Sequence, residues 1–144
     1  MSARIVVVDK PGDPEYWAVA APLGAFNAEN GFPVDSRAVA ILIEDESGTA
    51  VGGLWGKTGY GWLFVELLAV PEPMRGSGMG SRLMAAAEAI ATERGCVGAW
   101  LTTFTFQARG FYERLGYTLF AELEDSPSGN TRMFLRKRFA DEAA

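Results

Sequence analysis

A glycine-rich turn between two segments of opposite character is the feature that most limits the fold of this chain. The turn, "RGSGMG" at 75–80, follows the apolar run "WLFVELLAV" at 62–70, which has the length and composition of a buried strand. The residues after it keep a helical spacing that predicts one buried helix face at Leu83, Ala86, Ala87, Ile90 and Ala91. Backbone N–H groups of such a turn and of the helix start can converge on an anion. The sequence therefore predicts a strand, an anion-binding loop and a helix in that order.

Strand and helix patterns on both sides of the turn indicate a mixed sheet. Apolar and β-branched runs bounded by turn residues predict strands at 4–9, 37–45, 50–58, 60–70, 96–104, 117–125 and 131–139. The segment 14–31 has a helical pattern, and Pro22 and Gly24 predict that it forms two short helices or one kinked helix. A short helix is predicted at 107–116, with its apolar face at Ala108, Phe111, Tyr112 and Leu115. The fold class expected is α/β (α+β), with one domain over residues 1–144.

The residue counts exclude several kinds of site. The chain has 144 residues, no histidine and one cysteine, so a Ser-His-Asp triad, a Cys-His pair and an imidazole-based metal site are excluded. No metal is expected, and Cys96 is expected to be a core thiol. The net charge of −5 disfavours binding to nucleic acid. The one dense basic run, "RMFLRKRF" at 132–139, fits a solvent-exposed edge strand.

The apolar segments are too short for a membrane protein. None approaches the ~18 residues that a spanning helix needs, and the N-terminal "MSARIVVVDK" lacks the apolar length and the cleavage site of a signal peptide. We therefore expect a cytoplasmic protein without a membrane partner.

Two common phosphate-binding motifs do not fit the glycine turn. The Walker pattern requires Gly-Lys-Ser/Thr at its end, and the chain contains no such tripeptide. The dinucleotide pattern G-x-G-x-x-G fails because Gly80 comes one position too early after Gly76 and Gly78. Both motifs are therefore excluded by their spacing.

Another known loop does fit. The segment Arg75–Gly80 resembles the acetyl-CoA pyrophosphate loop of the GNAT superfamily of N-acetyltransferases, R/Q-x-x-G-x-G/A. The segment "GFYERLGY" at 110–117 resembles the second signature of that family, a helix that bears a tyrosine and ends in Leu-Gly-Tyr/Phe. The resemblance covers nearly the whole chain and implies the acyl-CoA N-acyltransferase fold, a mixed, mostly antiparallel central sheet flanked by helices. It also implies that acetyl-CoA is bound by the main chain of Leu68, Ala69 and Val70 and by Arg75, Gly76, Ser77, Gly78, Met79, Gly80 and Ser81.

The sequence differs from the family pattern at one position. Many members carry an asparagine seven residues before the tyrosine, where it contacts the pantetheine arm. In this chain that position is Thr105, and Gln107 follows two residues later. The resemblance therefore does not predict that particular contact.

Two side chains are candidates for the chemistry of acyl transfer. Tyr112 occupies the position of the family's general acid, so its phenol is expected to protonate the departing thiolate. Glu66 is a carboxylate inside an apolar run, and burial there would raise its pKa toward the range of a useful base. The alternatives are that Tyr112 only packs, that Glu66 faces solvent, and that water removes the proton from the amine.

The resemblance implies an enzyme that moves an acetyl group from acetyl-CoA to a primary amine in a ternary complex. A small-molecule acceptor is expected, because nothing beyond the minimal fold is present to hold a polypeptide. The alternatives are a non-catalytic CoA-binding or sensor module on the same fold, and a structural interaction domain. A homodimer is a further expectation from the family, and the sequence does not identify the acceptor.

Overall fold

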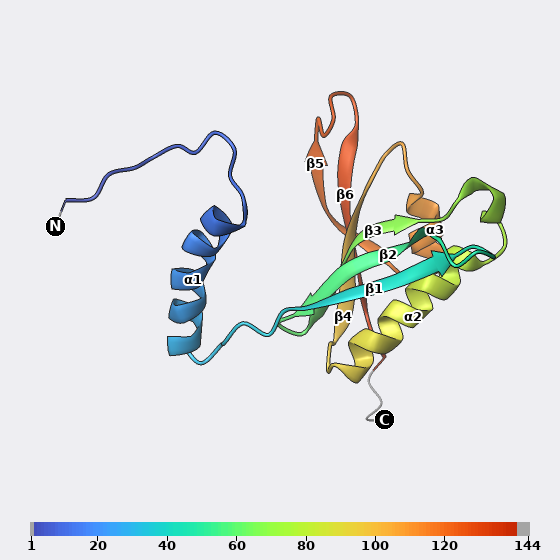
Figure 1. Cartoon of the computed structure of the whole chain (residues 1–144). Helices are drawn as coiled ribbons and strands as arrows, with labels where there is room; N and C mark the ends of the chain where they lie inside the picture. Colours follow the sequence, from blue (N-terminus) through green and yellow to red (C-terminus); the bar gives the residue numbers. More distant parts are fainter. Residues whose placement is uncertain (1, 141–144) are drawn as a thin grey trace. The chain divides into compact units, whose positions relative to one another are not determined.

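The structure is a computed structural model that describes residues 2–140, and its chain divides into two compact units. The units are Met1–Val34 and Asp35–Ala144. The first contains one helix, α1, and the second contains the sheet and the other helices (Figure 1).

The first unit is built on α1 (Asp13–Glu29), a continuous helix of 17 residues. It begins with Pro14 in its first turn, and the Glu15 carboxylate accepts a hydrogen bond of 2.9 Å from the Gly12 N–H. Pro22 lies inside this helix without dividing it, so of the two predicted alternatives, two short helices or one kinked helix, the first was wrong. No residue of α1 is buried.

The strand predicted at 4–9 is also absent. Residues 4–9 belong to no strand of the described part of the chain, and Ile5 is 99% exposed. A β-branched run favours extended backbone, but a strand also requires a partner that accepts and donates its backbone hydrogen bonds. The prediction was wrong because it used the residue pattern without identifying that partner.

The second unit is a six-stranded sheet in the order β1-β2-β3-β4-β6-β5. The strands are β1 (Arg37–Glu44), β2 (Ala50–Gly59), β3 (Trp62–Ala69), β4 (Gly98–Phe104), β5 (Thr118–Glu124) and β6 (Thr131–Arg138). The β3–β4 pair is parallel, whereas the other four neighbouring pairs are antiparallel. The predicted class, a mixed and mostly antiparallel sheet, is therefore confirmed. The basic run in β6 lies between β4 and β5, so its prediction as an edge strand was wrong.

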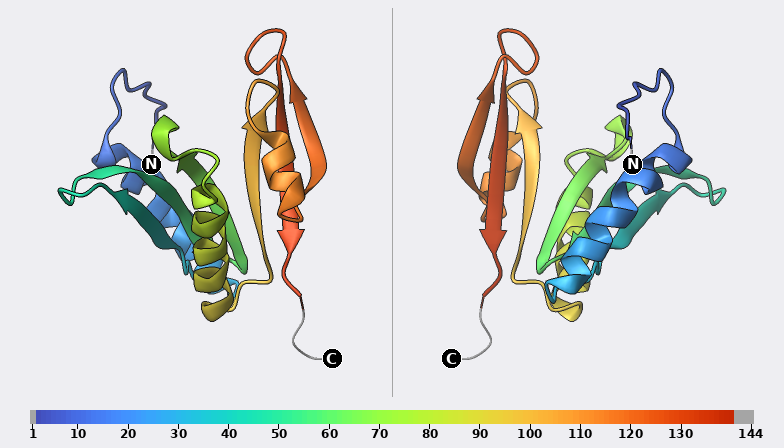
Figure 2. Two further views of the ribbon diagram at one scale, coloured as in Figure 1. Left: turned by 90° about the vertical axis from the view of Figure 1, so that its right-hand side faces the viewer. Right: turned by 90° about the vertical axis from the view of Figure 1, so that its left-hand side faces the viewer.

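The helices of the second unit follow the glycine turn and β4. A short 3₁₀ turn, η1 (Glu72–Met74), precedes α2 (Met79–Glu93), and α3 (Arg109–Arg114) follows β4. Gly95, with φ of 83°, ends α2 in the left-handed conformation that glycine adopts without strain. Figure 2 shows α2 and α3 on the same face of the sheet.

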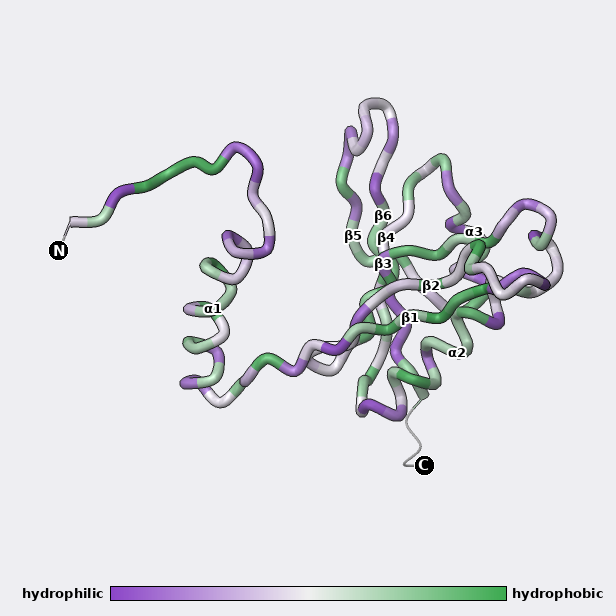
Figure 3. The backbone as a smooth tube through the Cα atoms, in the orientation of Figure 1, coloured by the Kyte–Doolittle hydropathy of each residue, from purple (hydrophilic) through white to green (hydrophobic). Residues whose placement is uncertain are grey.

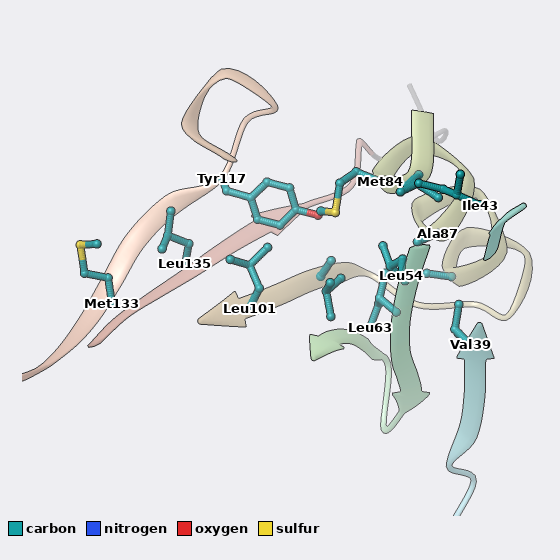
Figure 4. Close-up of a cluster of buried hydrophobic side chains, with 14 residues drawn as sticks. Val39, Ile43, Leu54, Leu63, Met84, Ala87, Leu101, Tyr117, Met133 and Leu135 are labelled. Carbon is teal, nitrogen blue, oxygen red and sulfur yellow. The ribbon is translucent and has the colours of Figure 1, made fainter. Parts of the chain in front are cut away.

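The core lies between α2 and the sheet. On α2 the buried residues are Leu83, Met84, Ala87 and Ala91, so Met84 replaces the predicted Ala86, which is exposed. On α3, Phe111, Tyr112 and Leu115 pack against the core, whereas the predicted Ala108 is exposed. Figure 4 shows Tyr117 and Met84 pointing toward one another inside this cluster. The backbone coloured by hydropathy shows hydrophobic residues along β1 and β3 and a hydrophilic turn between β5 and β6 (Figure 3).

Candidate functional site

The two central strands pair along only part of their length. Residues Trp62–Val65 of β3 pair with Gly98–Leu101 of β4. Beyond Val65, β3 continues to Ala69 beside β2, and beyond Leu101, β4 continues beside β6. The facing edges of 66–69 and 102–104 therefore do not pair with each other. On β4, Gln107 already bonds both the N–H and the carbonyl oxygen of Phe104. Figure 2 shows the ribbons of β3 and β4 diverging at this end. We call it the open end.

Glu66 lies at a β-bulge where the open end begins. Trp55 pairs with Leu67 and Gly56 pairs with Val65, so Glu66 is the extra residue on β3. Its side chain is exposed, and the expectation that it would be buried was wrong. An alternation read from the sequence cannot place a bulge, because one inserted residue changes which side chains share a face.

The glycine turn is anchored to the end of β3. Arg75 Nε donates a hydrogen bond of 2.9 Å to the Val70 carbonyl oxygen, and the Ser77 hydroxyl donates to the Met74 carbonyl oxygen. Gly76 and Gly78 have φ of 79° and 83°, which residues with a side chain rarely adopt. A Cβ at either glycine would meet nothing within 4 Å, so backbone conformation rather than crowding requires glycine at both positions.

The start of α2 is a suitable place for a diphosphate. Gly78 is the N-cap residue, and Met79, Gly80 and Ser81 form the first turn, which contains no acidic residue. The first N–H groups of a helix lack partners within the helix and carry a partial positive charge. The backbone conformation is compatible with an anion-binding loop at this position, which stays a prediction.

Gly80 also has a packing role that the sequence did not reveal. A Cβ on Gly80 would lie 3.1 Å from Phe111 Cζ and 3.8 Å from Val70 Cγ2. Such a distance to an aromatic ring carbon is tighter than ordinary packing. The missing side chain therefore lets α2, α3 and the end of β3 meet at one point.

Tyr112 lies half-buried on α3, on the same face of the sheet as α2. Its ring makes edge contacts with Phe111 and Tyr117, at centroid distances of 5.0 and 6.2 Å. Burial raises the pKa of the Tyr112 phenol, so it is protonated at neutral pH, as an ordinary tyrosine also is. A protonated phenol is the form that a general acid requires.

The turn from β4 to α3 is closed by two polar side chains. Gln107 Oε1 accepts hydrogen bonds from Thr103 Oγ1 at 3.3 Å and from the Phe104 N–H at 3.2 Å. Thr105 Oγ1 donates to Asn130 Oδ1 at 2.9 Å. Thr105, at the family's asparagine position, is therefore tied to the β5–β6 turn.

A partly buried polar cluster between α2 and β6 was missed by the sequence analysis. The Tyr117 hydroxyl donates to Glu88 Oε2 at 2.9 Å, and Lys137 Nζ pairs with Glu88 Oε1 at 2.8 Å. Burial, and then the nearby Glu88 carboxylate, raise the pKa of Tyr117 far above its ordinary value. The signal was present in the sequence, because Glu88 lies among the buried positions of α2, four residues after Met84.

No described helix is long and apolar enough to cross a membrane. Within residues 2–140, no group of three or more His, Cys, Asp or Glu side chains is placed to hold a metal ion.

Comparisons with known proteins identify the family of the chain. Residues 12–117 match the Acetyltransferase (GNAT) family. The chain is 42% identical over 122 residues to acetyltransferase Atu2258 of Agrobacterium fabrum, covering 85% of this chain and 89% of that protein. It is 50% identical over 93 residues to blasticidin-S acetyltransferase of Streptomyces morookaense, covering 64% of this chain and 68% of that protein.

Solved structures share the fold. An acetyltransferase-family crystal structure from Agrobacterium tumefaciens superposes with a TM-score of 0.87 at 40% identity, covering 95% of this chain and 100% of that one. An aminoglycoside 6′-N-acetyltransferase complexed with coenzyme A superposes with a TM-score of 0.64 at 20% identity, covering 74% of this chain and 76% of that one. The chain belongs to the acetyltransferase (GNAT) family and is an acetyltransferase.

Proposed function

We propose that the protein transfers the acetyl group of acetyl-CoA to a primary amine of a small molecule, by direct attack in a ternary complex. The observation that carries the proposal is the open end between β3 and β4, which begins at Glu66 and ends beside the glycine turn. The names of blasticidin-S acetyltransferase and of aminoglycoside 6′-N-acetyltransferase support a small-molecule acceptor.

Acetyl-CoA would be held along this open end. Main-chain groups of Leu68, Ala69 and Val70 would pair with the pantetheine amides as an added strand does. The diphosphate would accept hydrogen bonds from the backbone of residues 75–81, where the start of α2 adds positive potential. Arg75 would contribute charge near the phosphates while its Nε holds Val70.

The chemistry requires one proton to leave the amine and one to reach the thiolate. An alkylammonium of pKa about 10.4 is not a nucleophile until it loses a proton. Glu66, exposed at the bulge, would remove that proton directly or through water. A backbone N–H near Val70 would stabilise the oxyanion, and Tyr112 would protonate the thiolate as it departs.

A two-part measurement tests this proposal. Calorimetry with acetyl-CoA should show one binding site, and a panel of small primary amines assayed for CoA release should give turnover. No binding of acetyl-CoA by the folded protein would refute the proposal. Binding without turnover on any amine would instead favour a CoA-binding sensor.

The role of Glu66 has its own matched pair of variants. Glu66→Gln removes the base, and we expect kcat/KM to fall by about 10²-fold, the lower end of the range for general base catalysis. Glu124→Gln, at the exposed end of β5, removes the same charge elsewhere and should leave kcat/KM unchanged. Equal activity of both variants would remove Glu66 from the mechanism.

We also propose that the chain acts as a single domain and pairs as a homodimer. The family match at 12–117 spans parts of both compact units, which supports a single domain. Sedimentation velocity should give twice the chain mass of 15.5 kDa, and a single species of the monomer mass would contradict the dimer.

A further inference from the structure

Strand β6 places several arginines on the sheet face opposite α2. Met133 and Leu135 point into the core, so the alternation of side chains along a strand puts Arg132, Arg136 and Arg138 on the other face. This is the basic run that the sequence predicted as an edge, and the structure places it inside the sheet. The proposed transfer assigns it no role.

Arg132 is held more firmly than the other two. Its guanidinium carbon lies 5.4 Å from the ring centre of Phe104 and 5.9 Å from that of Phe134. Its Nη2 donates a hydrogen bond of 3.0 Å to Thr102 Oγ1. Arg136 and Arg138 are exposed and each lies over one ring. Because two rings and a hydroxyl already fix Arg132, it would lose little conformational entropy on binding a ligand.

The hydrogen-bonding capacity of Arg132 is not filled. Its Nε is buried and has no acceptor among residues 2–140. Neither of the two ion pairs that these residues form includes Arg132. The buried Nε is closed to solvent, so an anion from outside the chain would meet the Nη atoms, of which only Nη2 has an acceptor among residues 2–140. With no carboxylate beside it, the half-buried guanidinium is suited to such an anion.

Arg132 also lies at the level of the open end. It pairs with Phe104, three residues beyond Leu101, the last residue of β4 that pairs with β3. The next residue, Met133, accepts a hydrogen bond of 3.4 Å through its sulfur from Arg109 of α3. Arg132 is therefore on the opposite face of the sheet from α3, next to the strands that diverge.

We infer that Arg132 binds a carboxylate of the acceptor, so that the substrate class is an amine that also carries a carboxylate, as amino acids do. The inference rests on the proposed acetyl transfer and specifies its acceptor. A guanidinium presents donors in a fork that matches the two oxygens of a carboxylate. Thr102 keeps the fork in place, so it is a positioning residue.

Matched pairs of probes test the inference. L-Lysine with cadaverine and L-ornithine with putrescine differ by one carboxylate, and CoA release gives kcat/KM for each member. We expect the amino acid of each pair to be favoured by about tenfold or more, the size expected for hydrogen bonds to a charged group. Arg132→Gln should bring the ratio near one, and Arg132→Lys should restore part of it.

Arg136→Gln provides the control, because it removes a neighbouring charge from the same face and should keep the wild-type ratio. The inference is overturned if wild type prefers the decarboxylated amines, if it acetylates no member of either pair, or if Arg132→Gln lowers both members of a pair equally. Calorimetry with acetyl-CoA and the wider amine panel separate these outcomes from failure of the proposed function, in which acetyl-CoA does not bind or no amine of the panel gives turnover.

Discussion

The two ends of the β3–β4 pair differ in what they bury. At the closed end, where the strands pair, Leu63, Val65, Ala99 and Leu101 are all in the core. Gly98 admits the Trp62 ring, because a Cβ there would come within 2.6 Å of it. At the open end, Glu66 and Leu67 are exposed, and the facing edges of the strands do not pair.

This difference indicates that one end of the strand pair stabilises the fold while the other end can bind a ligand. Apolar burial and backbone pairing stabilise the closed end. Substituting a buried residue there should therefore lower the free energy of unfolding. At the open end 66–69 and 102–104 have no strand partner in each other, so main-chain groups of β3 there can serve a ligand instead. The following predictions separate these two roles.

The largest effect should come from the closed end. Leu63 is fully buried, so Leu63→Ala should lower the free energy of unfolding by about 2–5 kcal/mol through lost burial and the cavity left behind. Leu67→Ala, where the side chain is 65% exposed, should change it by less than about 0.5 kcal/mol. Urea denaturation measures both, and equal losses would show that the two ends do not differ.

The next effect should appear in turnover. Tyr112→Phe keeps the ring contacts with Phe111 and Tyr117 and removes only the acidic hydroxyl. We expect kcat to fall by about 10²-fold while urea denaturation is nearly unchanged. Steady-state kinetics with an accepted amine checks this, and an unchanged kcat would exclude Tyr112 as the acid.

A smaller effect should distinguish two glycines of similar backbone conformation. Gly78 and Gly48 have φ of 83° and 81°, and a Cβ added to either would meet nothing within 4 Å. Alanine at either should cost about 1 kcal/mol, because the left-handed conformation strains a residue with a Cβ. Gly78→Ala alone should weaken binding of acetyl-CoA in calorimetry, and equal affinities for both variants would contradict a role of the loop.

The smallest effect should appear at alkaline pH. The pKa of Tyr117 is raised in the folded state, so below about pH 10 both states keep the proton and pH has no effect through this group. Above that pH the unfolded state loses the proton first, and the free energy of unfolding falls. Tyr117→Phe should be less stable by about 1 kcal/mol at neutral pH, since it loses the bond to Glu88.

Between about pH 10 and 11, urea denaturation should then show a smaller loss of stability for Tyr117→Phe than for the parent protein, because the variant lacks the group whose pKa is raised on folding. Tyr16→Phe, with a ring that is 65% exposed, is the control and should follow the parent protein. If the free energy of unfolding of Tyr117→Phe and that of the parent protein fall equally over this pH range, the raised pKa of Tyr117 would be contradicted.

Local patterns were sufficient to predict most of the fold. The strands of the second unit and the helix after the glycine turn follow from periodicity and turn chemistry. The strand predicted at 4–9 failed because pairing is not a local property. The place of β6 inside the sheet depends on the order of the strands, which cannot be predicted from the residues of a single strand.

The candidate site was predictable to the extent that its motifs are contiguous. The loop at 75–80 and the helix with Tyr112 were found from short segments. The bulge at Glu66, the contact of Gly80 with Phe111 and the two rings around Arg132 depend on residues far apart in the sequence. Such contacts follow from packing, so spacing alone could not supply them.

The absent side chain of Gly80 has a consequence for the choice of acyl carrier. Because the first turn of α2 packs against Phe111, beside Tyr112, direct packing joins the place that would receive the diphosphate to the helix that carries the phenol. The span between them is then constant, whatever acyl group is carried. An acyl donor with a longer or shorter chain between diphosphate and thioester could not reach both the diphosphate position and the phenol. The protein would therefore select its acyl donor by the length of that chain.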